Sequence, residues 1–163
     1  MLIDLDLAKK LDGNASGARQ QTGTVQFMAI GVLQKADHTY RHDLESFFYV
    51  LLWMCAYRSW ERGFGGTNKK MPEACRIEKW GTGTFIDIAE AKTAHMTPNS
   101  FEDKILSGFP APLEGIKPLC RNIRSLLFGS AGIDIEAPSG DPGVLYKAIL
   151  DAYEGAITQL AGK

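Results

Sequence analysis

Residues 43–57 read DLESFFYVLLWMCAY, and this stretch decides the fold. Asp43 has the side chain that a helix N-cap needs, because its carboxylate can accept hydrogen bonds from the free amides of the first turn. From Phe47 to Tyr57 the stretch is apolar on every side, and a helix without a polar face must be surrounded by protein. The run is about half of the ~20 residues that a membrane-spanning helix needs. We therefore expect a buried core helix that begins at Asp43.

Helical signals continue through the rest of the chain. Thr84 and Asp87 have the spacing of a capping box, and Gly129 is typical of a helix end. Only residues 2–8 alternate between apolar and polar side chains, which indicates a short strand. The further helices are expected at residues 84–95, 98–106, 113–127 and 142–160. The sequence thus predicts a mainly α fold with at most one short strand at the N-terminus.

Composition and charge restrict the class of protein. The chain has 163 residues, of which 45% are hydrophobic and 23% charged, and this usage is typical of a globular domain. A formal net charge of −1 argues against a nucleic-acid or membrane-surface protein, because both depend on a basic excess. The cysteines are odd in number and widely spaced, which favours a reducing compartment over a disulfide scaffold. We expect an intracellular protein, in the cytoplasm or the nucleus.

Three segments in the first third of the chain carry a family resemblance. They read LIDLDLA at residues 2–8, GTVQFMAIGVL at residues 23–33 and YRHDLESFFYVLLW at residues 40–53. In order and spacing they resemble the Asp-Phe-Gly segment of protein kinases, the end of the activation loop, and the start of the large buried helix of the kinase C-lobe. The particular residues in these motifs are similar to those of the fungal-type protein kinase family. The resemblance covers residues 2–57, whereas residues 58–163 fit a C-lobe only in the number and order of their helices.

The resemblance implies a role for three residues. Asp4 would bind the Mg²⁺ that bridges the nucleotide phosphates. Periodicity alone would instead place Asp4 on the solvent-exposed side of an edge strand. Thr24 would help to position the acceptor hydroxyl of a Ser/Thr substrate, although it could simply form a turn before a helix. Asp43 would lie at the start of the large helix and accept hydrogen bonds from backbone amides of the catalytic loop. This role is compatible with an ordinary N-cap. His42 is expected to be a hydrogen-bonded structural histidine.

Gly31 departs from the family pattern. Kinases have Glu at this position, paired with an Arg from a later helix, and the Arg available here would be Arg121 or Arg124. A buried charge that loses its partner costs typically ~3–5 kcal/mol. Either that Arg is exposed in this chain, or the lobe is weakened.

The chain contains none of the other parts that phosphoryl transfer needs. A kinase requires a glycine-rich loop, a lysine on its third strand and a catalytic-loop Asp, all of which precede the segment that contains Asp4. The resemblance therefore implies a truncated Ser/Thr kinase domain that is inactive by itself. ATP and Mg²⁺ would bind the full-length kinase and neither would bind this chain tightly. The expected partners are a protein substrate or the missing kinase half.

Two other interpretations stay open. The chain could be a non-catalytic binding module built on C-lobe helices, or an unrelated helical domain with chance motif matches. For the kinase interpretation we expect one face of the Phe47–Tyr57 helix to be bare, because the kinase helix that precedes the catalytic loop is absent. Leaving a face of roughly 500 Å² exposed would cost about 12 kcal/mol of hydrophobic stabilisation. An isolated chain should then be marginally stable or aggregated.

Overall fold

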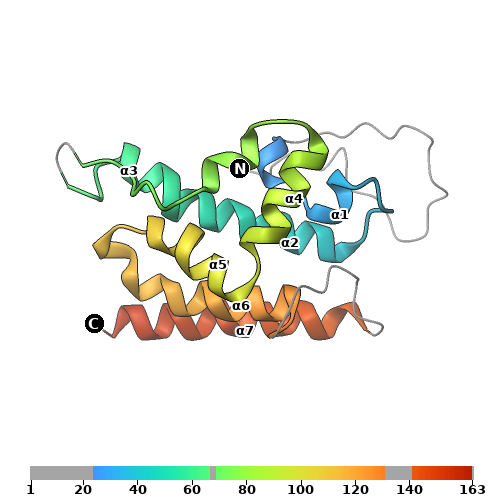
Figure 1. Cartoon of the computed structure of the whole chain (residues 1–163). Coiled ribbons are helices and arrows are strands. Elements are labelled where there is room, and N and C mark those ends of the chain that lie inside the picture. Colours follow the sequence, from blue (N-terminus) through green and yellow to red (C-terminus); the bar gives the residue numbers. More distant parts are fainter. Residues whose placement is uncertain (1–23, 67–68, 131–140, 163) are drawn as a thin grey trace.

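The computed structural model describes residues 24–66, 69–130 and 141–162 (Figure 1). Within these ranges all regular elements are helices, which confirms the mainly α prediction; the strand expected at residues 2–8 lies outside them. The α-helices are α1 (Ile30–Leu33), α2 (Tyr40–Trp53), α3 (Ser59–Glu61), α4 (Phe85–His95), α5 (Pro98–Ser100), α6 (Lys117–Phe128) and α7 (Pro142–Ala161). Short 3-10 or π segments are Val25–Phe27, Met54–Arg58, Ile77–Gly81, Phe101–Ile105, Leu106–Gly108 and Ala111–Ile116.

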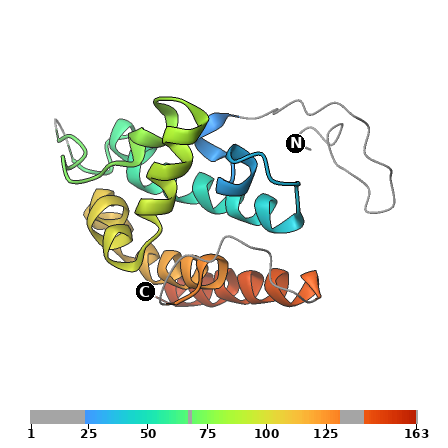
Figure 2. The same cartoon turned by 45° about the vertical axis from the view of Figure 1, so that its right-hand side comes forward.

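Helix α2 lies in the middle of the structure. Both views show α1 and α4 on one side of α2, and α6 and α7 side by side on the other (Figures 1 and 2). The inward side of α2 supplies Phe48, Tyr49 and Leu52, none of which is more than 1% exposed. These side chains belong to a continuous buried core that every one of these neighbouring helices joins. The prediction that this helix is central to the fold is therefore confirmed.

The start of α2 differs from the prediction. The helix begins at Tyr40, and its N-cap is Thr39, whose amide donates to Nδ1 of His42 (3.0 Å). The N-cap assignment of Asp43 is therefore wrong, because the Thr39–His42 pair already completes the cap. Asp43 lies in the first turn, exposed to solvent, with its carboxylate 3.3 Å from Nε2 of His38. The positive end of the helix dipole still stabilises a carboxylate in the first turn.

The outward side of α2 is not enclosed. Phe47 is 70% exposed, and Val50 and Met54 follow it at 38% and 42%. Their spacing of three and four residues places them on one stripe of the helix. The expectation that protein covers the whole helix is therefore wrong, whereas the expectation of a bare apolar face is confirmed.

Three ends of the later helices lie where local signals predicted them, whereas α6 begins at Lys117 and not at residue 113, and the helix expected at 98–106 is divided into α5 and two short segments. Thr84 and Asp87 form the capping box of α4, with the amide of Asp87 donating to Oγ1 of Thr84 (3.2 Å). Gly129 ends α6 with a φ of 79°, a backbone conformation that favours glycine. Asp141 begins α7 and accepts a hydrogen bond from the amide of Gly143 (2.9 Å).

Helix α7 presents apolar residues on two sides. Leu145 and Ile149 are buried in the core. The other side carries an apolar stripe at alternating spacings of four and three residues: Tyr146, Leu150, Tyr153, Ile157 and Leu160. All of these except the half-buried Tyr153 are at least 42% exposed. In the part of the chain that is described, no helix, α7 included, has the length and apolar character to span a membrane.

Candidate functional site

The segment from Thr24 to Leu33 lies on the core beside α2 and α4. Thr24 begins the segment in an exposed position, and its carbonyl accepts a hydrogen bond from the amide of Phe27 (2.8 Å). The ring of Phe27 contacts Trp53 of α2 edge-on, with centroids 6.0 Å apart. Ala29 and Ile30 follow and are fully buried. The segment therefore passes from the surface into the interior over a few residues.

Glu45 holds the start of α1. The first amides of a helix have no acceptor within the helix, and the N-cap residue Ala29 has no side chain that could serve. Oε1 of Glu45, a residue of α2, accepts the amide of Ile30 at 2.7 Å. A buried carboxylate at a helix N-terminus is favoured by the helix dipole as well as by the hydrogen bond. One side chain of α2 thus fixes where α1 begins.

Arg41 balances the charge of Glu45 and reaches a third helix. Its Nη1 donates to Oε2 of Glu45 (3.0 Å), and both side chains are at most 1% exposed. Its Nη2 donates to the carbonyl of Leu127 in the last turn of α6 (2.6 Å), and the guanidinium lies 5.3 Å from the ring of Phe128. A cation is favoured at a helix C-terminus. The pair therefore connects the start of α1 with the end of α6 through α2.

Lys92 of α4 is a second buried cation. Its Nζ donates to the carbonyl of Met28 (2.5 Å) and lies 3.9 Å from the ring centroid of Tyr49 and 5.4 Å from that of Trp80. Burial lowers the pKa of Lys92 from 10.5 to about 7, although the nearby Glu45 opposes this shift. The side chain therefore has a proton that can leave near neutral pH.

Tyr49 and His95 complete the surroundings of Lys92. The hydroxyl of Tyr49 donates to Oε1 of Glu45 (2.6 Å), and burial, with Glu45 beside it, raises the pKa of Tyr49. Trp80 donates from Nε1 to Nδ1 of His95 (3.0 Å). Burial lowers the pKa of His95 to about 4, so His95 is neutral at pH 7 and can accept this bond. Neither group adds charge to the cluster.

The sequence-predicted site residues are not brought together. Asp4 lies outside the described residues. Thr24 and Asp43 are both exposed, and they belong to different elements, the N-cap of Val25–Phe27 and the first turn of α2. His42 is buried and accepts the amide of Thr39, and burial lowers its pKa, which confirms the structural role expected for it. Among the described residues, no group of three His, Cys, Asp or Glu side chains could hold a metal ion.

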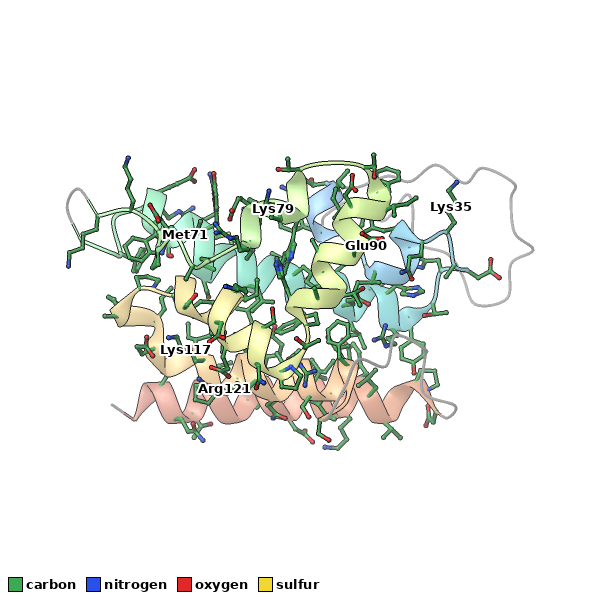
Figure 3. The ribbon with its side chains drawn as sticks, in the orientation of Figure 1. Lys35, Met71, Lys79, Glu90, Lys117 and Arg121 are labelled. Carbon is green, nitrogen blue, oxygen red and sulfur yellow. The ribbon has the colours of Figure 1, made fainter. Side chains whose placement is uncertain are left out.

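Gly31 faces His42 in place of a charged partner. A Cβ added at Gly31 would lie 2.4 Å from Nε2 of His42, so the imidazole fills the space that a side chain would need. Arg121 is exposed and forms a two-bond ion pair with Glu102 (2.6 and 2.9 Å). In Figure 3 it lies in the lower half of the structure, far from Lys35 just after the end of α1. Of the two candidate arginines, Arg121 is therefore the exposed one.

The guanidinium of Arg124 binds backbone carbonyls. It is buried, and it donates to the carbonyls of Met96 and Gly129, both at 2.7 Å. Backbone carbonyls thus accept the hydrogen bonds of its guanidinium. The loss of a Glu at position 31 therefore leaves neither candidate Arg without hydrogen-bond acceptors.

The sequence patterns did not indicate Arg41, Glu45 and Lys92 as a group. One signal was present, because Arg41 and Glu45 are four residues apart on one side of α2, and unlike charges at that spacing can pair. Lys92 carries no comparable signal, since its partners lie far away along the chain. These three side chains form one group of buried charges, hereafter the buried cluster, together with Tyr49.

An apolar groove lies between α2 and α7. Its volume is about 270 Å³. It is lined by Leu44, Phe47, Tyr146, Ile149, Leu150 and Tyr153. The exposed stripes of α2 and α7 therefore meet at this groove, hereafter the α2–α7 groove, and no charged residue lines it.

Comparison with known proteins gives one match. The family model described as fungal protein kinase matches residues 1–55 of the chain. No curated protein and no solved structure gives a match. The matched residues contain all three motifs at residues 2–8, 23–33 and 40–53, and within the described ranges they form the segment before α1, α1 itself and α2. Over this stretch the chain is similar to fungal protein kinases.

Replacing Gly31 tests the close approach of His42. The Gly31→Ala variant should lose about 1–3 kcal/mol of unfolding free energy, because the new methyl group overlaps the buried imidazole. Gly155→Ala in α7 is the matched control, since nothing lies within 4 Å of its Cβ. That variant should be as stable as the parent or gain about 0.5–1 kcal/mol from the helix propensity of Ala. Urea unfolding measures both, and equal stability of the two variants would contradict the packing described.

Proposed function

We propose that these 163 residues are the C-lobe portion of a fungal-type Ser/Thr protein kinase, from the Asp-Phe-Gly-like segment onward. The observation that carries the proposal is the family-model match over residues 1–55, which contains three kinase motifs in the kinase order. The helical fold of the described residues supports it, because α2 is a large helix in the middle of the structure with further helices on both sides. In the complete kinase the reaction would be transfer of the ATP γ-phosphate to a protein hydroxyl.

The proposal gives three residues a role. Asp4 would bind Mg²⁺ at the nucleotide phosphates, and Thr24 would position the acceptor hydroxyl. Asp43 would accept backbone amides of the catalytic loop. The exposure of Thr24 and Asp43 supports these roles, because both side chains are accessible to a substrate or to another part of a kinase.

We also propose that these residues alone do not catalyse phosphoryl transfer. Catalysis of this reaction depends on several groups that together position and neutralise the phosphates. The sequence contains no glycine-rich loop followed by a strand lysine, and no His-Arg-Asp triplet. Asp4 alone would give a weak Mg²⁺ site, so tight binding of ATP is not expected.

The α2–α7 groove supports the proposal that this chain binds a partner. Its lining is apolar, and the stripe on α7 has the four-and-three spacing that a second helix can pack against. In a kinase C-lobe, the helix that precedes the catalytic loop covers one side of the helix equivalent to α2. We propose that this part of the kinase half occupies the groove. The same observation favours the second candidate function, a non-catalytic module that binds a helix of another protein.

The activity proposal predicts that the purified chain transfers no γ-phosphate to a protein substrate, because the lysine and the catalytic Asp of a kinase are absent from it. A radiolabelled transfer assay with Mg²⁺ and ATP measures this. Asp4→Ala is the control, since the activity of a contaminating kinase would not change with that substitution. Transfer that the parent chain shows and Asp4→Ala abolishes would overturn the proposal.

The partner proposal predicts that the chain, expressed alone, associates through its exposed stripe. Phe47→Ser should make it more monomeric in size-exclusion chromatography and leave its melting temperature unchanged, because Phe47 is 70% exposed. The adjacent Phe48→Ser is the matched control and should unfold the chain, because Phe48 is 1% exposed. A parent chain that is a monodisperse monomer with a cooperative melt above about 50 °C would contradict the need for a partner.

A further inference from the structure

Two peptide groups of one short segment are held from two different helices. Lys92 of α4 binds the carbonyl of Met28, and Glu45 of α2 binds the amide of Ile30. Only the fully buried Ala29 separates these two residues. Tyr49 connects the two sides, because its hydroxyl donates to Glu45 while its ring lies under Nζ of Lys92. Together these side chains clamp the chain where it enters α1.

The clamp acts on the backbone. Its hydrogen bonds to Met28 and Ile30 involve main-chain atoms, so they fix the path of the chain whatever side chains the segment carries. Thr24 begins the same segment, joined to it through the turn that its carbonyl closes with Phe27. Release of the clamp would therefore free the segment on which the proposed function places the acceptor hydroxyl.

Lys92 is completely buried, so its protonated form is costly. Its exposed fraction is 0%, and Glu45, the anion beside it, already forms an ion pair with Arg41 (3.0 Å). Deprotonation of Lys92 removes a charge from a site that water does not reach. Burial accordingly lowers the pKa of Lys92 to about 7.

Among the described residues, Glu45 is the one charged group that faces Lys92. The uncharged groups that face it are Tyr49 of α2, Trp80 of the Ile77–Gly81 segment and the Met28 carbonyl. Arg41 lies behind Glu45 and already uses its carboxylate. His95, on the same helix as Lys92, is neutral and accepts from Trp80.

We propose that Lys92 and Glu45 are positioning residues that clamp the Met28–Ile30 backbone, and that opening of this clamp takes up one proton at Nζ of Lys92. In the closed state the amine is buried and neutral above about pH 7, whereas in the open state it is hydrated and holds its proton to about pH 10. The segment should therefore be held more firmly as the pH rises through this window, and least firmly below it. The significance for substrate positioning rests on the proposed function, but the clamp itself does not.

Amide hydrogen exchange of the full chain tests the clamp without any activity assay. The protection factor of the Ile30 amide, corrected for the intrinsic exchange rate, should rise up to about tenfold per pH unit between pH 7 and 9. In Lys92→Met this rise should disappear, because no proton is taken up on opening. Lys147→Met is the matched control, since Lys147 is an exposed lysine of α7 paired with Asp151, and its profile should follow the parent. Parallel profiles for the parent and Lys92→Met would overturn the proposal.

A second measurement covers the case in which Lys92→Met does not fold. An NMR titration of the Nζ-adjacent carbon of Lys92 in the parent chain should give a midpoint between about 6 and 8, close to the pKa of about 7. A midpoint near that of an ordinary lysine, about 10.4, would overturn the proposal. Because both readouts concern the chain alone, failure of the clamp leaves the kinase proposal standing, and the absence of a kinase role leaves the clamp standing.

Discussion

The buried ion pair between Arg41 and Glu45 is the constraint on which the rest of the structure depends. Glu45 supplies the acceptor that the first amide of α1 lacks, and Arg41 supplies a donor to the last turn of α6. Each charge meets the helix end that its sign favours. Taking two ions out of water is expensive, and the extra hydrogen bonds to Ile30, Leu127 and Tyr49 compensate for that cost. Through one turn of α2 the pair therefore specifies how three helices meet.

Much of the fold could be predicted because its signals are local. The caps at Thr84 and Asp141 and the glycine at position 129 each act within a few residues, and the structure places helix ends at all three. The start of α2 was misplaced because His42 serves in its cap, where a Glu or Gln is the usual residue. The exposed stripe through Phe47 could not be derived from periodicity, since an apolar helix looks the same in sequence whether or not a neighbour covers it.

The buried cluster was not predicted, and the reason is distance along the chain. Glu45 contacts a residue 15 positions away, Lys92 one that is 64 away, and Arg41 one that is 86 away. No pattern in a single sequence specifies such pairs, whereas family motifs point to Asp4, Thr24 and Asp43 directly. The two sets are complementary. The motif residues with described positions are exposed, and the buried cluster holds the segment and the helix that carry them.

The most direct test of this account is a double-mutant cycle on Arg41 and Glu45, measured by urea unfolding. Arg41→Met and Glu45→Gln should each cost about 3–5 kcal/mol, because each leaves a buried group without its partner. The double variant should lose much less than the sum, with a coupling energy of at least about 2 kcal/mol. If the single variants do not fold, a cooperative transition in the double variant gives the same answer. Additive losses within about 0.5 kcal/mol would show that the pair does not hold the structure together.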